Sequence, residues 1–200
     1  MTDIPIILLA AGQSSRMGGV DKLMQLIDSI PLLTRSARNA RAVGPVFVAL
    51  PPEPHPRYKA LGGLDVQPVP VPDATEGMNA SLRAAMRQLP PDARAVMVLL
   101  ADLPDLTQAD LAAVLSARQT HPDSLIWRGA TADGKPGHPV IFDRTLFDQL
   151  SALQGDDGAQ KVVRAHQGKV HLHCLPDRNA LLDLDTPDDW YTWRKKRTPE

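Results

Sequence analysis

A glycine-rich segment near the start of the chain carries side chains suited to binding a polyphosphate. Residues 12–22 read GQSSRMGGVDK, so three glycines and two serines lie around Arg16 and before Lys22. Glycine permits positive φ angles and close backbone approach, and consecutive free amides in such a loop form a concave anion site. Arg16 and Lys22 add two positive charges. The segment therefore predicts a triphosphate-binding loop, and the alternative is a surface turn whose charges are incidental.

Asp102 directly follows the most apolar run of the chain, residues 95–101. A carboxylate at the end of a central strand opens into the same crevice as the loop after the first strand. One carboxylate, together with phosphate oxygens and waters, is the usual way in which proteins hold Mg²⁺. The alternative is a strand-end aspartate that merely starts a turn. A second acidic run, DLDTPDD at residues 183–189, is also typical of a helix start, with Thr186 as the cap and Pro187 in the first turn.

The elements that must position these side chains alternate between strands and helices. We expect strands at residues 4–10, 46–50, 66–71, 95–101, 125–127, 139–142 and 170–174, and helices at 32–43, 78–89, 107–120, 146–153, 159–166 and 187–193. Prolines at 51–56 predict a loop, and those at 68 and 70 predict an edge strand. The alternation predicts an α/β fold: a single-domain, Rossmann-like, mostly parallel sheet flanked by helices. Ligands of such sheets bind beyond the carboxyl ends of the strands.

Bulk composition excludes several classes of protein. The 200 residues include 22 basic and 23 acidic side chains, so the net charge is -1 and no overall field draws the chain to nucleic acid or to a membrane. The single cysteine, Cys174, excludes an internal disulfide framework and a cysteine-built zinc site. The apolar start is too short to span a bilayer and has no basic leader, so we expect a cytoplasmic location.

The string LAAGQSSRMGGVDK at residues 9–22 resembles the signature L-A-A/G-G-x-S-x-R-M-G-x-x-K of MobA-like nucleotidyltransferases. The resemblance implies the fold of nucleotide-diphospho-sugar transferases, with Arg16 and Lys22 on the triphosphate. Asp102 begins a segment similar to the family's D-x-P, and residues 183–189 resemble its D-I-D-T-P-E-D. These matches imply that Asp102 and Asp185 are ligands of Mg²⁺, and that Arg16, Lys22 and Asp102 are the catalytic residues.

Residues 77–82, GMNASL, resemble the family segment that lies near the base and ribose of the nucleotide. Ordinary capping of a helix is the alternative for this segment. The nucleotide-binding residues that the resemblance implies are Leu9, Ala10, Ala11, Gly12, Ser14, Arg16, Lys22, Asn79, Ser81 and Asp102.

Two later segments, GKPGHPV at 134–140 and GDDGAQ at 155–160, resemble stretches of molybdenum cofactor cytidylyltransferases and close relatives. The acceptor in that family is a pterin phosphate. The resemblance therefore implies an acceptor pocket shaped by His138, Gly155 and Asp156. Gln160 departs from the family's usual arginine, which weakens an assignment of acceptor phosphate to this position.

The predicted activity is a Mg²⁺-dependent transfer of a nucleoside monophosphate to the terminal phosphate of molybdopterin, with release of pyrophosphate. CTP is the favoured donor, because guanylyltransferases of the family usually begin L-A-G-G where this chain has Ala11, and because GHPV at 137–140 is typical of the cytidylyl branch. The alternatives are a GTP-using molybdenum cofactor guanylyltransferase, a sugar-phosphate nucleotidyltransferase, and a non-catalytic protein that delivers cofactor to a client molybdoenzyme.

The resemblance also suggests that the single domain has a nucleotide-binding half and an acceptor-binding half. Residues 1–105 would form the nucleotide-binding half and residues 106–193 the acceptor-binding half. The run RKKR at 194–197 lies in what we interpret as a solvated basic tail, residues 194–200.

Overall fold

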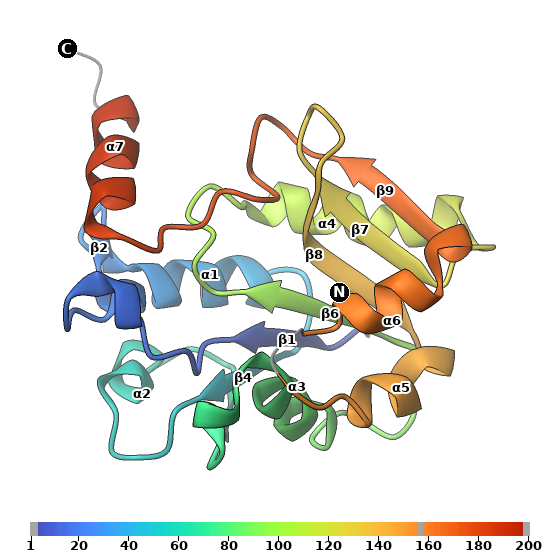
Figure 1. The fold of residues 1–200 in the computed structure, drawn as a ribbon, viewed down its shortest axis with the longest axis horizontal. Helices are drawn as coiled ribbons and strands as arrows, with labels where there is room; N and C mark the ends of the chain where they lie inside the picture. Colours follow the sequence, from blue (N-terminus) through green and yellow to red (C-terminus); the bar gives the residue numbers. More distant parts are fainter. Residues whose placement is uncertain (1–3, 156–157, 198–200) are drawn as a thin grey trace.

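The computed structural model describes residues 4–155 and 158–197. In this part of the chain a seven-stranded sheet has the order β5-β4-β1-β6-β8-β7-β9 (Figure 1). Its strands are β1 (Ile6–Leu9), β4 (Val46–Leu50), β5 (Gln67–Pro70), β6 (Ala95–Leu100), β7 (Ile126–Ala130), β8 (Pro136–Asp143) and β9 (Val170–Cys174). Strands β5, β4, β1 and β6 are parallel, β8 is antiparallel to β6 and β7, and β9 is parallel to β7. The sheet is mostly parallel, as predicted.

Helices cover both faces of the sheet. They are α1 (Leu32–Arg41), α2 (Pro56–Ala60), α3 (Met78–Met86), α4 (Gln108–Thr120), α5 (Phe147–Ser151), α6 (Gln160–Ala165) and α7 (Pro187–Arg197). Successive strand residues point to opposite faces. Ile6 and Leu8 of β1 pack with buried residues of α1, α4 and α7, whereas Ile7 packs with those of α3, α5 and α6 (Figure 1). The buried strand β1 therefore ends between two covered faces, and the loop that follows it opens at the edge of the sheet.

Most predicted elements are present, with shorter bounds. The predicted cap of α4 is confirmed, because the Thr107 hydroxyl accepts from the amide of Asp110 at 3.2 Å and the Asp110 carboxylate accepts from the amide of Thr107 at 2.9 Å. The proline-rich strand β5 lies at an edge of the sheet, as expected. A small hairpin of β2 (Leu26–Ile27) and β3 (Ile30–Pro31) was not predicted, because two-residue strands leave no period to detect.

Residues 194–197 form the last turn of α7, and all four of their side chains are exposed to solvent. The Arg194 and Arg197 guanidinium groups lie 5.0 and 4.7 Å from the ring centres of Trp190 and Trp193, and this cation–π stacking favours continuation of the helix. Within the described residues, no helix combines the length and hydropathy needed to cross a membrane.

Candidate active site

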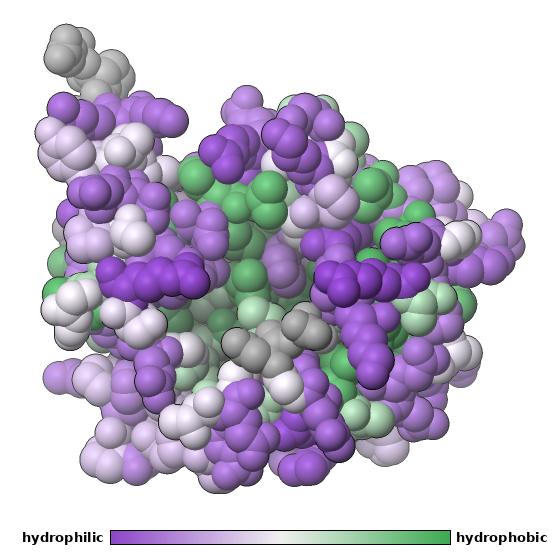
Figure 2. Space-filling view, in the orientation of Figure 1, coloured by the Kyte–Doolittle hydropathy of each residue, from purple (hydrophilic) through white to green (hydrophobic). Residues whose placement is uncertain are grey.

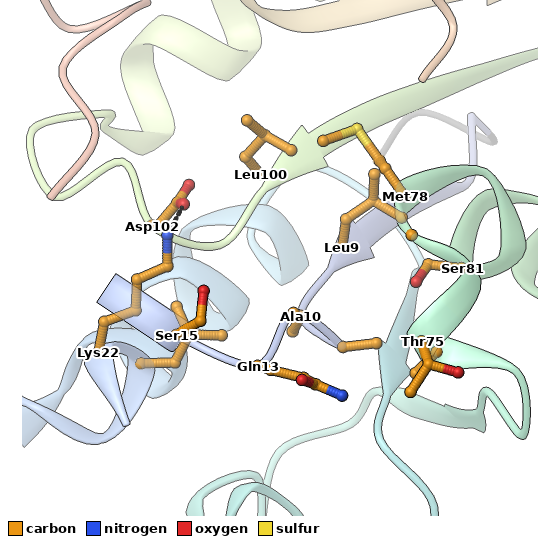
Figure 3. Close-up of a pocket in the computed structure, with 15 residues that line it drawn as sticks. Leu9, Ala10, Gln13, Ser15, Lys22, Thr75, Met78, Ser81, Leu100 and Asp102 are labelled. Carbon is orange, nitrogen blue, oxygen red and sulfur yellow. Dashed lines mark hydrogen bonds and ion pairs between the residues drawn. The ribbon is translucent and has the colours of Figure 1, made fainter. Parts of the chain in front are cut away.

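A cavity of about 520 Å³ lies beyond the carboxyl ends of β1 and β6 (Figure 3). Its walls come from the end of β1 and the loop after it, from the start of α3, and from Asp102. Seven of the ten predicted nucleotide-binding residues line it: Leu9, Ala10, Ala11, Gly12, Lys22, Ser81 and Asp102. On the face shown in Figure 2, hydrophobic side chains form the floor of a hollow and hydrophilic side chains surround it. The topology therefore gathers these residues at the end of the sheet where α/β folds bind ligands.

The other three predicted residues lie elsewhere. The hydroxyl of Ser14 accepts from the amide of Lys22 at 3.2 Å, and Ser15 lines the cavity in its place. The amide side chain of Asn79 is fully buried and donates to the carbonyl of Gln154 at 2.9 Å. Arg16 is mostly exposed, with 73% of its side-chain surface open to solvent. Sequence reasoning also missed Gln13 and Thr75, which line the cavity.

Four charged side chains, of which Lys22 and Asp102 line the cavity, are connected by ion pairs. The Nζ of Lys22 lies 2.5 Å from Oδ2 of Asp102 and 2.5 Å from Oδ1 of Asp185, and Nη1 of Arg16 lies 2.6 Å from Oδ2 of Asp185. Burial lowers the pKa of Lys22, but the two carboxylates outweigh it and hold the pKa above its ordinary value. Lys22 is therefore a fixed cation at neutral pH.

The two aspartates fit a divalent metal ion. Oδ1 of Asp102 is buried and has no hydrogen-bond partner, so a buried carboxylate oxygen is left unsatisfied. In the described ranges, no three histidine, cysteine, aspartate or glutamate side chains group in a way that could hold a metal alone. Such a site suits Mg²⁺, which is commonly held by one or two carboxylates with substrate phosphates and water.

The loop that carries Arg16 and Lys22 is held by a buried arginine that sequence reasoning missed. Arg57 is 2% exposed. Its guanidinium donates to the carbonyl of Ala10 at 2.6 Å and forms a two-pronged ion pair with Asp21, at 2.8 and 2.7 Å. Arg57 thus connects the end of β1 to the residue before Lys22. Positive φ angles within the loop, 61° at Gly18 and 90° at Gly19, match the conformation that glycine tolerates.

A second set of contacts fixes the segment that carries Asp185. Thr186 caps α7, as predicted, because its hydroxyl accepts from the amide of Asp189 at 3.2 Å and the Asp189 carboxylate accepts from the amide of Thr186 at 2.8 Å. Upstream, the amide of His138 donates to the carbonyl of Ala180 at 2.7 Å. A side chain at Gly137 would place its Cβ 2.0 Å from that carbonyl oxygen, so the close approach requires glycine.

A smaller pocket of about 100 Å³ adjoins the first cavity, and the two share Leu9 and Met78 as lining residues. The predicted acceptor residue His138 lines this pocket, and burial lowers its pKa to about 4, so the ring is neutral near pH 7. Gly155 instead lines a separate surface hollow, so the structure does not bring it together with His138. Asp156 lies outside the described residues.

Arg128 of β7 also lines the second pocket, although no sequence pattern indicated it. Its Nε donates to the carbonyl of Gly137 at 2.8 Å, and its Nη1 donates to Oε1 of Gln160 at 3.3 Å. Gln160 of α6, which stands where the resemblance led us to expect arginine, therefore orients an arginine from β7.

Comparisons with known proteins agree with the predicted family and fold. A sequence profile described as MobA-like NTP transferase domain matches residues 6–170. A probable molybdenum cofactor guanylyltransferase of Synechococcus elongatus is 33% identical over 92% of this chain and 94% of its own length. The molybdenum cofactor cytidylyltransferase of Escherichia coli is 26% identical over 99% of both chains.

Among solved structures, Rv0371c of Mycobacterium tuberculosis H37Rv is similar, with 28% identity, a TM-score of 0.83, and coverage of 97% of this chain and 98% of its own. A crystal structure of that protein in complex with manganese has a TM-score of 0.79, covering 96% and 97%. Because the profile matches well over half of the chain, and a relative above 30% identity spans nearly all of it, the protein belongs to the MobA-like NTP transferase family.

Proposed function

We propose that the protein transfers a nucleoside monophosphate from a nucleoside triphosphate to the terminal phosphate of a molybdopterin-type acceptor and releases pyrophosphate. The observation that carries the proposal is that Lys22 and Asp102, which line a cavity at the carboxyl end of the sheet, meet Asp185 through Lys22. Relatives named as molybdenum cofactor guanylyltransferase and cytidylyltransferase support the acceptor class.

The transfer does not require a general base. An oxygen of the acceptor phosphate attacks the α-phosphorus, a new phosphorus–oxygen bond forms, and the bond to the β-phosphate breaks as pyrophosphate leaves. A phosphate monoester is already ionised near neutral pH, since its second pKa is about 6. Catalysis therefore rests on alignment and on relief of repulsion between two anions.

The proposed roles follow from that requirement. Lys22 and Arg16 would hold the departing pyrophosphate, while the backbone at residues 10–12 and Ser81 would position the nucleotide. Asp102 and Asp185 would hold Mg²⁺, which when bound would neutralise phosphate charge during the transfer. The unsatisfied Oδ1 of Asp102 supports this metal assignment. The manganese complex of a relative supports a divalent cation in general terms.

For the donor we propose CTP. Ala11 is 3% exposed, packs with Ala49, Val71 and Ala80, and lines the cavity. Guanylyltransferases of the family usually have glycine at this position, and GHPV at 137–140 is typical of the cytidylyl branch. GTP is the second candidate, because a relative at 33% identity is named a guanylyltransferase.

A pyrophosphate-release screen tests the proposal. CTP, GTP, ATP and UTP are crossed with molybdopterin and with several sugar phosphates in the presence of Mg²⁺. We expect release with CTP and molybdopterin. A clear preference for GTP would overturn the choice of donor, and release with sugar phosphates alone would overturn the acceptor. Tight binding of nucleotide and molybdopterin without release would favour a delivery protein over an enzyme.

A further inference from the structure

The second pocket contains an arginine that has no acidic partner in the part of the chain that the structure describes. Arg128 is half-buried, and its hydrogen bonds go to neutral oxygens, the carbonyl of Gly137 and the side chain of Gln160. The contrast is Arg57, which is also buried but carries a two-pronged ion pair with Asp21. Burial without a counter-charge lowers the pKa of Arg128.

The apolar walls of the pocket raise the free-energy cost of keeping the charged guanidinium of Arg128 away from water. Most of the lining side chains are apolar: Leu9, Leu82, Val98, Val140, Phe142 and Val163. A charge taken out of water is unfavourable unless it is paired. His138 cannot supply a negative charge, and its neutral ring adds no positive charge near pH 7. Arg128 is therefore the charge that defines the chemistry of this pocket, and the complementary ligand is an anion.

The hydrogen bonds of Arg128 also fix how it meets a ligand. Gly137 binds Nε and Gln160 binds Nη1, so the planar guanidinium is held from two sides. Nη2 has no protein partner within the described ranges. A planar guanidinium with free donors matches the oxygens of a phosphate group. At about 100 Å³ the pocket suits a phosphate group with a small apolar neighbour.

We infer that Arg128 is a specificity-determining residue that binds the phosphate monoester of the acceptor, with Gln160 as its positioning residue. This inference rests on the proposed function, because it assumes that the acceptor lies beside the nucleotide cavity. The shared lining residues Leu9 and Met78 place the two pockets side by side.

The first experiment measures kinetics on the full chain. In Arg128→Met the KM for molybdopterin should rise by at least ~10-fold, since a hydrogen bond to a charged group contributes about 1.5–3 kcal/mol. The KM for CTP should change by less than ~2-fold, because Arg128 lies outside the nucleotide cavity. Arg164→Met is the matched control: it removes the same charge from an exposed position of α6, and it should leave both KM values unchanged.

A second variant guards against misfolding of Arg128→Met. Gln160→Glu keeps the size of the side chain but sets a carboxylate against the guanidinium of Arg128, where it competes with the acceptor. It should also raise the KM for molybdopterin and leave that for CTP alone. An unchanged molybdopterin KM in a folded Gln160→Glu, or in a folded Arg128→Met, would overturn the inference.

The second experiment does not depend on turnover. Binding of phenyl phosphate is followed by ligand-observed NMR, with CTP present to fill the first cavity and EDTA to prevent catalysis; benzyl alcohol is the uncharged comparison. Wild type and Arg164→Met should bind phenyl phosphate, and Arg128→Met should not. Equal binding by Arg128→Met would reject the anion site. Arg128-dependent binding without any turnover of molybdopterin would keep the anion site and reject the proposed acceptor.

Discussion

The two neighbouring cavities differ in whether their charged side chains have oppositely charged partners. At the first, two cations and two carboxylates pair with one another across Lys22, Arg16, Asp102 and Asp185. At the second, the guanidinium of Arg128 faces apolar walls without a carboxylate in the described ranges. The four side chains at the first site thus already have oppositely charged partners, whereas Arg128 at the second gains one only when an anion binds. Pairing preserves geometry at one site, and an unpaired charge selects a ligand at the other.

The largest expected effect concerns Arg57, the buried arginine that holds the glycine-rich loop of the first site. Arg57→Met should lower the free energy of unfolding by about 3–5 kcal/mol, because it leaves Asp21 without its partner in a partly buried place. Urea denaturation measures this. Arg41→Met is the control, since its partner Asp65 is 85% exposed and the loss should stay below about 1 kcal/mol. Equal losses of unfolding free energy in both variants would show that the ion pair of Arg57 stabilises the fold no more than an exposed pair does.

Next in size is the loss of one member of the paired charges. Lys22→Ala or Asp102→Ala should lower turnover by at least ~10²-fold, a typical result of removing one preorganised electrostatic group. Pyrophosphate release from the purified variants measures it. Lys135→Ala, which breaks an exposed ion pair with Asp133, should keep normal turnover. Near-normal release from either active-site variant would refute the assignment.

A pH experiment asks whether the second pocket keeps its histidine neutral. The pKa of His138 is lowered from 6.5 to about 4 by burial, so between these values the unfolded chain binds more protons than the folded one. Stability must therefore fall as the pH drops, by roughly 2 kcal/mol from pH 7 to pH 5 for this group. Urea denaturation of wild type and His138→Gln isolates the contribution. An identical pH dependence in both proteins would mean that His138 titrates normally.

The smallest expected effect concerns the donor. Ala11→Gly should shift the ratio of kcat/KM for GTP over CTP upward by roughly 10-fold, since one methyl group in a pocket contributes about 1–3 kcal/mol to discrimination. Paired turnover assays with both nucleotides measure the shift. Ala132→Gly, at an exposed turn between β7 and β8, should leave the ratio as in wild type. A ratio that stays constant in Ala11→Gly would remove Ala11 as a determinant of the base.

The first cavity could largely be predicted from the sequence because its parts are contiguous strings at strand ends. The glycine-rich loop directly follows β1 and Asp102 follows β6, and parallel neighbours bring both ends to one edge of the sheet. The meeting of Lys22 with Asp185, 163 residues away, was expected from the resemblance and is present in the structure. Their catalytic and metal-binding roles stay predictions.

The arginines of the two sites could not be predicted, because each acts through partners distant in sequence. Arg57 follows a run of prolines that predicts only a loop, and Pro56 in fact begins α2. Arg128 lies one residue beyond the predicted strand at 125–127, since a charge in a short apolar run looks like the end of a strand. Similarly, the predicted strand at 139–142 leaves out Pro136 and Gly137, although β8 runs through both. The local sequence pattern does not indicate these contacts, because they join residues that are distant in the sequence.

The missing side chain of Gly137 links the two sites mechanically. Its neighbour His138 faces the smaller pocket, while its own backbone lies against Ala180, five residues before Asp185. Any larger residue would push this strand away from the segment that leads to the carboxylate. A larger residue at Gly137 is therefore expected to disturb the smaller pocket and the segment of Asp185 at once, whereas a substitution at His138 alters the lining of the smaller pocket alone.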